Sequence, residues 1–330
     1  MAYDLELEHI IQRLKESKAK RALLQLPEGL KTRGMEIIAR LERETGAVVT
    51  LQVTPVFGAC DMLSRSRHPD AEFVIHVGHS PMPSLKPEIP TIFIEARSDL
   101  DVAPVVKLAA RGMSGKIGLL TTVQHVHKLD EMRSLLEAAG LEVHIGKGGS
   151  RLAHPGQVLG CDFSAARAVA DKVDSFLFVG TGLFHPLGAA LATGKPVLAA
   201  DPSSSRLVDL ADAREKALRQ RHGAIARAMD AKRFGILACT KPGQQRSELA
   251  ESLKRELEGA GKEAIILSFD HLEPANLRGL ALDAYVSTAC PRLAIDDYLR
   301  FEQPILTPVE LRVLLGKERW DGYRFDEIGC

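Results

Sequence analysis

The sequence has no excess of charge of either sign. Its 43 lysine and arginine residues equal its 43 aspartate and glutamate residues, so the formal net charge at pH 7 is zero. Proteins that coat nucleic acid or an anionic membrane depend on a surplus of basic residues that neutralise phosphates. We therefore expect neither nucleic acid nor a membrane among the partners of this chain.

Long apolar runs are missing as well. The best candidate, residues 183–200, contains His185, Lys195 and two prolines, which is not the composition of a membrane span. Residues 1–18 carry acidic groups where a signal peptide needs basic ones, and their apolar positions recur at helical spacing. We expect an amphipathic helix at this end and a cytoplasmic protein.

Cysteine is scarce, and the short motifs that mark common sites are absent. Five scattered cysteines are too few for a disulfide framework, which leaves core thiols, metal ligands or catalytic groups as their roles. The sequence has none of the close CxxC pairs that often hold structural zinc. No GxGxxG follows a predicted first strand and GxxxxGK[ST] is absent, so a plain nucleotide-binding module has little support.

What the sequence does contain is a pattern that occurs three times. A basic residue opens a short apolar strand in RALLQLPEGL from Arg21, KIGLLTTVQH from Lys116 and RFGILACTKP from Arg233. A helical pattern follows each strand, and a second strand comes after the glycine that ends each helix. These glycines are Gly46, Gly140 and Gly261.

Further strands alternate with helical or loop segments in each unit. Such alternation predicts parallel sheets with right-handed crossovers, so the fold class is α/β. We expect an internal triplication into three similar small domains, at residues 1–112, 113–204 and 205–330. The third would include a polar linking helix over residues 205–232. Two doubly wound domains remain the alternative.

Each unit contributes one cysteine that follows a strand: Cys60, Cys161 and Cys290. Ligands collect beyond the carboxyl ends of parallel strands, so these thiols are candidates for one shared site at the domain junction. Three thiolates suit an iron-sulfur cluster with one open iron better than structural zinc, which usually has four protein ligands. The alternative for each is a buried thiol that packs as a small apolar group. We interpret Cys239 as such a packed thiol, and we assign no role to the terminal Cys330.

Eight local motifs together resemble a known family, the diphthamide synthesis enzymes in their archaeal form. The motifs span roughly residues 5–308 and occur in the order LPEGL, GACD, VIHVGHS, TTVQHVHKLD, GCDFS, FLFVGTGLFHPLG, CTKPGQQR and STACPRLAIDD. The resemblance implies three domains of similar fold, a homodimer, and a 4Fe-4S cluster held by Cys60, Cys161 and Cys290. It also implies use of S-adenosylmethionine without the CxxxCxxC motif of ordinary radical enzymes, and this sequence lacks that motif.

The resemblance implies a specific reaction. A reduced cluster, supplied by an unidentified electron donor, would pass one electron to the sulfonium of S-adenosylmethionine. Cleavage of the bond to the γ-carbon of the methionine part would then give a 3-amino-3-carboxypropyl radical. This radical would add to a histidine of translation elongation factor 2, which makes the chain a transferase for the first step of diphthamide biosynthesis.

Polar and glycine residues in the strand-end loops are candidates for cofactor binding. Loops of this kind present backbone N–H groups and charge-assisted contacts to amino and carboxylate groups. Turn chemistry and helix capping are the alternative role for each of them. The candidates are Gln25, Glu28, Gly29, Gln124, Gly182, His185, Lys241 and Gln244.

Two other functions remain open at this point. A quinolinate-synthase-like dehydratase also has three α/β domains and a three-cysteine 4Fe-4S cluster, which it uses as a Lewis acid. A non-catalytic partner subunit of a diphthamide synthase would keep the fold without the reaction. Retention of all three cysteines argues against the non-catalytic subunit. The GLFHPLG and STACPRLAIDD segments argue against the dehydratase.

Overall fold

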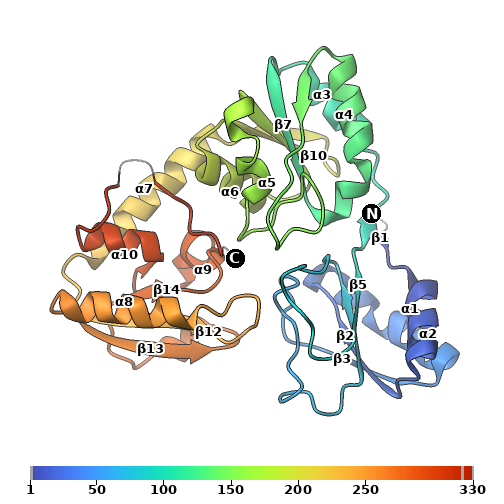
Figure 1. Ribbon diagram of the computed structural model, residues 1–330, viewed down its shortest axis with the longest axis horizontal. Coiled ribbons are helices and arrows are strands. Elements are labelled where there is room, and N and C mark those ends of the chain that lie inside the picture. The colour runs from blue at the N-terminus through green and yellow to red at the C-terminus, as the bar shows by residue number, and fades with distance from the viewer. Residues whose placement is uncertain (1–2, 321–322, 329–330) are drawn as a thin grey trace.

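The chain folds into three α/β units that surround a common centre. The computed structural model describes residues 3–320 and 323–328, and Figure 1 shows the three sheets as separate bodies with the C-terminal end near the middle. None of the helices in these ranges combines the length and apolarity needed to cross a membrane.

The first unit contains a four-stranded parallel sheet with the order β3-β2-β4-β5. Its elements are α1 (Leu7–Ser17), β2 (Arg21–Gln25), the 3-10 helix η1 (Glu28–Arg33), α2 (Gly34–Thr45), β3 (Val48–Leu51), β4 (Phe73–Val77) and β5 (Thr91–Ile94). The predicted N-terminal amphipathic helix is confirmed, because Ile10, Ile11 and Leu14 of α1 are buried while its charged residues face solvent. A short antiparallel ribbon joins β1 (Tyr3–Asp4) to β6 (Arg97–Ser98).

The second unit has a five-stranded sheet with the order β11-β10-β9-β7-β8. Its strands are β7 (Lys116–Thr121), β8 (Glu142–His144), β9 (Ser175–Val179), β10 (Val197–Asp201) and β11 (Arg206–Asp209). Its helices are α3 (Ala103–Ala110), η2 (Val123–Lys128), α4 (Leu129–Ala138), α5 (Ser164–Arg167), η3 (Ala170–Lys172) and α6 (Phe184–Thr193).

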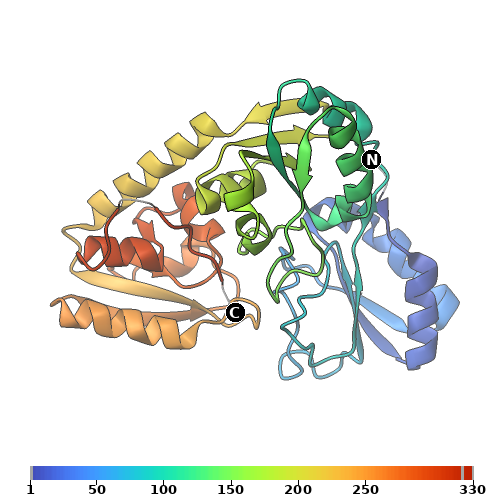
Figure 2. The ribbon, with the colours of Figure 1, turned by 45° about the horizontal axis from the view of Figure 1, so that its top comes forward.

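The third unit has the sheet order β13-β12-β14-β15, and all its strands are parallel. Its strands are β12 (Arg233–Cys239), β13 (Glu263–Phe269), β14 (Ala284–Ser287) and β15 (Ile305–Leu306). Its helices are α7 (Ala211–Ala228), α8 (Ser247–Gly259), η4 (Pro274–Leu277), α9 (Arg292–Ile295), η5 (Tyr298–Arg300) and α10 (Pro308–Leu314). Figure 2 shows α7 running from the second unit to the third.

The three sheets share one strand order, in which the second strand lies beside the first and the third and fourth follow on the other side. The predicted α/β class with parallel sheets is therefore confirmed. The glycines that end the repeated helices have left-handed backbones, with φ of 70° at Gly46, 86° at Gly140 and 72° at Gly261. Glycine adopts this conformation at little cost because it has no Cβ atom. A glycine after an apolar helical pattern therefore predicts the end of the helix from sequence alone.

Two segments differ from the prediction. The linking helix begins at Ala211 and not at Ser205, because residues 206–209 form β11, which pairs antiparallel with β10. The chain reverses at Ser205, where φ is 54°, and the Asp209 side chain accepts a hydrogen bond from the Ala211 N–H. Helix α3 precedes the predicted boundary at residue 112, yet its apolar face packs in the core of the second unit.

A buried ion pair fastens the linking helix to the third unit. Arg221 of α7 is 1% exposed and Glu310 of α10 is fully buried, with Nε–Oε1 at 2.8 Å and Nη2–Oε2 at 2.5 Å. Arg221 also donates to the backbone oxygens of Ala294 and Ile305, and Glu310 accepts from the Tyr323 hydroxyl. The charges are thus matched by hydrogen bonds, which a buried pair needs in order to offset its desolvation.

Arg221→Met is expected to destabilise the third unit by roughly 3–5 kcal/mol, because it leaves the Glu310 carboxylate buried and unpaired. Urea denaturation, together with hydrogen exchange of peptides from α7 and α10, measures the effect. Arg219→Met is the matched control on the same helix, since the Arg219 side chain is 73% exposed and pairs with the exposed Glu215. Equal unfolding midpoints for the two variants would contradict this account.

Candidate active site

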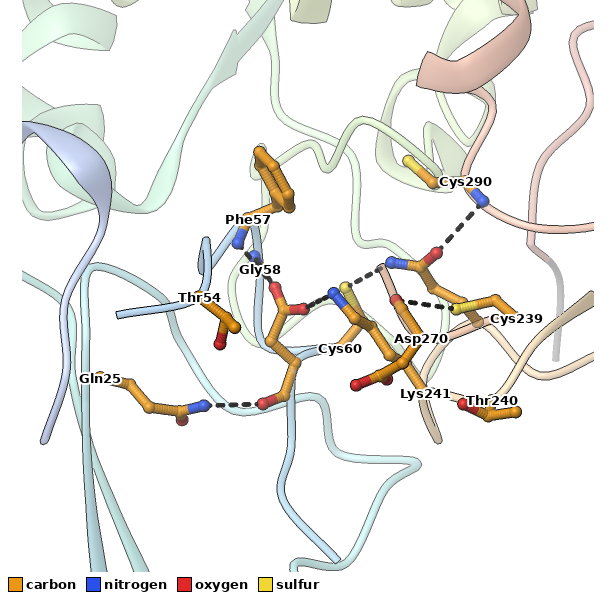
Figure 3. Close-up of polar contacts among 12 residues, drawn as sticks. Gln25, Thr54, Phe57, Gly58, Cys60, Cys239, Thr240, Lys241, Asp270 and Cys290 are labelled. Atoms are coloured by element: carbon orange, nitrogen blue, oxygen red, sulfur yellow. Dashed lines mark hydrogen bonds and ion pairs between the residues drawn. The ribbon is translucent and has the colours of Figure 1, made fainter. Parts of the chain in front are cut away.

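Three thiols, one from each unit, line a single cavity of about 170 Å³. Cys60 lies in the loop after β3, and Cys290 lies just past β14. Figure 3 labels both residues. Cys161 lies 17 residues beyond the end of β8, farther than the short loop we expected. A β-bridge between Thr121 and Gln157 brings this long loop back to the carboxyl end of β7. Cys161 therefore still reaches the cavity that it shares with Cys60 and Cys290.

Burial controls the ionisation of these thiols. It raises the pKa of Cys290 to about 12, raises that of Cys60 well above the ordinary value, and raises that of Cys161. Repulsion from Asp61 and from Cys161 adds to the shift at Cys60, and repulsion from Cys161 adds to the shift at Cys290, whereas Arg151 partly offsets the shift at Cys161. The metal-free thiols are thus protonated near pH 7, and a metal that bound them would release protons.

A loop of the third unit, residues 241–244, contacts two of the cysteine loops directly. A Cβ atom placed on Gly243 would lie 2.5 Å from the Cβ of Cys60 and 2.6 Å from its Cα, so only glycine fits there. The Gln244 side chain donates from Nε2 to the Cys60 sulfur at 3.2 Å and accepts at Oε1 from the Cys290 N–H at 3.3 Å. This loop therefore packs the first unit against the third at the cavity wall.

An ion pair between Lys241 and Asp61 closes the same contact. Both side chains are largely buried, at 12% and 3% exposed, and Lys241 also lies over the Phe57 ring at 5.8 Å. Asp61 accepts hydrogen bonds from the N–H groups of Phe57 and Gly58, which shapes the turn that carries Cys60 (Figure 3). Burial lowers the pKa of Lys241, but attraction to Asp61 outweighs it and the pKa is raised, so the Lys241 ammonium stays charged near pH 7.

Arg151 ties the second unit to this loop. Its Nη2 donates to the Gly243 oxygen at 2.9 Å and approaches the Cys161 sulfur at 3.6 Å. The side chain is 5% exposed, and its Nε has no hydrogen-bond partner among the described residues. One N–H of this buried guanidinium is thus left without an acceptor among the described residues, which is uncommon for a buried polar group.

The donor set fits an iron-sulfur cluster. The cavity offers three thiols, and two side chains direct N–H groups at their sulfurs, which is the usual outer shell of such a group. Within the described residues no three His, Cys, Asp or Glu side chains are grouped as ligands of a single ion. Each cysteine of a four-iron cluster binds a different iron, so a cluster does not require three side chains grouped around one ion.

Two neutral histidines face the same cavity. Burial lowers the pKa of His79 and of His185 to about 4, so both imidazoles are uncharged at pH 7. A second cavity of about 520 Å³ adjoins this one and shares part of its wall, at Gly78, His79, Thr122 and Gln124. The two cavities together provide space for ligands well beyond the three thiols.

The predicted cofactor residues divide into two groups. Gln124, His185 and Gln244 line the thiol cavity, and Gly29 lines the adjoining one. The other four lie outside both cavity walls: Gln25, Glu28, Gly182 and Lys241.

Each of those four has a structural environment of its own. The buried Gln25 amide bonds to His76, Gln52 and the Asp61 backbone oxygen. Glu28 is exposed and pairs with Lys31, whereas Gly182 occupies an exposed turn with φ of 79°. Lys241 pairs with Asp61 and also lines a further cavity of about 130 Å³, whose wall includes Gln244 and Cys290. Turn and packing contacts, the alternative considered above, therefore describe the surroundings of Gln25, Glu28 and Gly182.

Sequence reasoning missed Arg151, Asp61 and Gln157 as parts of the site. Asp61 follows Cys60 as Asp162 follows Cys161, which was a usable signal. Arg151 and Gln157 lie in the long loop before Cys161, where no local pattern marks them. Cys239 is buried, does not line the thiol cavity, and approaches the Asp270 backbone oxygen at 3.9 Å, while Cys330 is outside the described residues.

Comparison with known proteins identifies the family. The family model for diphthamide synthesis proteins matches residues 26–325. The chain belongs to this family. It is 40% identical to the 2-(3-amino-3-carboxypropyl)histidine synthase of Pyrococcus horikoshii over 99% of this chain and 94% of that one. The synthase of the same name from Methanocaldococcus jannaschii is 27% identical over 99% and 93% of the two chains.

A solved member of the family has the same fold. The crystal structure of Dph2 from Pyrococcus horikoshii with a 4Fe-4S cluster superposes with a TM-score of 0.91 at 38% identity, and covers 99% of this chain and 95% of that one. Synthases of this family are transferases, and the chain is an enzyme of that class. The family assignment therefore selects diphthamide synthesis over the dehydratase alternative.

The site also predicts an acid-sensitive fold. His125 lines the cavity of about 520 Å³ that adjoins the thiol cavity, and its side chain is 3% exposed. Burial lowers the pKa of His125 to about 4. Because its folded pKa lies below the unfolded value of about 6.5, stability is full above pH 6.5 and falls as the pH drops toward 4. As the pH falls from 7.5 to 5.5, protonation of His125 should lower the free energy of unfolding by about 1 kcal/mol.

His125→Gln should remove that part of the pH dependence in urea denaturation of the metal-free protein. His9→Gln is the control, because the His9 side chain is 52% exposed on α1. A wild-type pH slope in His125→Gln would show that His125 is not the group responsible.

Proposed function

We propose that this protein is a 4Fe-4S, S-adenosylmethionine-dependent enzyme that transfers a 3-amino-3-carboxypropyl group to a histidine of translation elongation factor 2. This would be the first step of diphthamide biosynthesis. The observation that carries the proposal is the convergence of Cys60, Cys161 and Cys290, from three separate sheets, on one cavity. The synthase name of the relatives and the cluster in the Pyrococcus structure support it.

The three cysteines would hold the cluster at the junction of the units and leave one iron without a protein ligand. When bound and reduced, the cluster supplies one electron to the sulfonium of S-adenosylmethionine, and a radical mechanism follows. The protein's part is to keep the thiols desolvated and fixed, which burial at 8% exposed for both Cys60 and Cys161 achieves. We also infer that the three units of shared strand order arose from one repeated unit.

The cavity wall places little positive charge beside a cationic substrate. His79 and His185 are neutral, so they do not repel a sulfonium. Arg292, the one lysine or arginine among the described residues that line the cavity, is paired with Asp296 at 2.8 Å and lies over the Phe184 ring at 5.1 Å. An oriented guanidinium of this kind can bind the carboxylate of the methionine part while Asp296 compensates its charge.

The partners follow from the same proposal. Elongation factor 2 is the protein substrate, an electron donor that is still to be identified reduces the cluster, and a second copy of the chain completes a homodimer. We expect no nucleic acid and no membrane, and a cytoplasmic location. The balanced charge of 43 basic and 43 acidic residues supports the exclusion of nucleic acid.

Single changes of Cys60, Cys161 and Cys290 to alanine should each abolish aminocarboxypropyl transfer and remove the absorbance and paramagnetic resonance of a four-iron cluster. Each change removes a thiolate ligand. Cys239→Ala is the matched control, a buried cysteine that does not line the cavity, and it should retain both signals. Cluster loss in Cys239→Ala with an intact cluster in Cys290→Ala would overturn the ligand assignment.

The products separate the proposed reaction from its alternatives. With dithionite, S-adenosylmethionine and archaeal elongation factor 2 under anaerobic conditions, the protein should release 5′-methylthioadenosine and add one 3-amino-3-carboxypropyl group to a histidine. Chromatography of the nucleoside and mass spectrometry of the factor measure both. Release of 5′-deoxyadenosine would indicate cleavage at the adenosyl carbon, and transfer without reductant would exclude the radical step.

A further inference from the structure

We propose that Gln244 is a positioning residue that sets the reduction potential of the group bound by the three cysteines. It would do so through the hydrogen bond that its amide donates to the Cys60 sulfur. The inference rests on the proposed cluster and goes beyond it, since it assigns to Gln244 a redox role in place of the contact with S-adenosylmethionine that the sequence suggested.

Both ends of the Gln244 amide are engaged by cysteine loops. Nε2 lies 3.2 Å from the Cys60 sulfur, and Oε1 accepts the Cys290 N–H at 3.3 Å, as drawn at the labelled cysteines in Figure 3. The residue is 8% exposed, so water does not replace either partner readily. The Cys290 contact also fixes the orientation of the amide, because only an oxygen can accept from that backbone N–H, and the N–H₂ end must face the sulfur.

The loop that carries Gln244 leaves the amide little freedom to move. Its own N–H donates to the Lys241 oxygen at 2.9 Å, which closes a turn. The neighbouring Gly243 lies against the Cys60 backbone and accepts a hydrogen bond from Arg151. The Lys241–Asp61 ion pair fastens the other end of the turn. The donor is therefore held at the sulfur before any metal arrives.

A fixed N–H donor at a cluster sulfur favours the reduced state. Reduction adds negative charge, part of which resides on the sulfur atoms, and a hydrogen bond stabilises the more negative form more strongly. Removal of the donor should therefore make the cluster harder to reduce. A residue that only joined the two loops would leave the potential unchanged once the cluster was in place.

The test compares Gln244→Glu with Gln245→Glu. The glutamate at 244 keeps an oxygen for the Cys290 N–H but presents no amide donor to Cys60, whereas Gln245 is the exposed neighbour with the same change of charge. The reconstituted proteins are titrated with dithionite and monitored by paramagnetic resonance. At a fixed applied potential the reduced-to-oxidised ratio of Gln244→Glu should fall at least tenfold, which for one electron is about 59 mV. Gln245→Glu should match the wild type.

An unchanged potential in Gln244→Glu, or an equal shift in Gln245→Glu, would overturn the inference. Gln244→Met provides a neutral second variant, and its potential should fall as well. If both 244 variants fold by circular dichroism but bind no iron, Gln244 is required for assembly and the tuning role is rejected. A wild-type protein that assembles no four-iron cluster would instead reject the proposed function, so the two failures are distinguishable.

Discussion

The close contact between the Gly243 backbone and Cys60 is the constraint on which the site depends. The absence of a side chain at 243 lets the third unit approach the first, and the buried Lys241–Asp61 pair forms only at that separation. Arg151 reaches the same loop from the second unit. Breaking a buried pair of this kind typically costs 3–5 kcal/mol, a large part of the stability of a domain. The three thiols thus converge because one short loop receives contacts from all three units.

Local patterns predicted the elements but not their partners. The first two strands of each unit, the helix between them and the glycines that end those helices at 46, 140 and 261 are encoded within windows of about ten residues, and sequence reasoning found them. Strand β11 was missed because it is only four residues long and falls within the predicted linking helix, although the turn-forming residues DPSSS at 201–205 mark the chain reversal that pairs it with β10. Helix α3 lies on the far side of the predicted boundary because its apolar face is completed by residues of another sheet.

The site shows the same division. The one-cysteine-per-unit pattern pointed to Cys60, Cys161 and Cys290, since a residue type and its place after a strand are visible in sequence. The partners of polar side chains are not visible there. Gln25 resembled a ligand-binding residue but is satisfied by His76 and the Asp61 backbone, and Arg151 had no motif although it touches both Cys161 and Gly243. Contacts between distant segments decide such roles, and they require the fold.

The spacing of the three cysteines along the chain has a mechanical consequence. Any single group that bound all three sulfurs would close two loops, one of 101 residues from Cys60 to Cys161 and one of 129 from Cys161 to Cys290. In the chain-entropy model, a cross-link that closes a loop of about 100 residues removes unfolded-state freedom worth nearly 5 kcal/mol. Cofactor loading would then cross-link the whole molecule, and its loss would loosen all three units at once, including segments that lie far from the cavity.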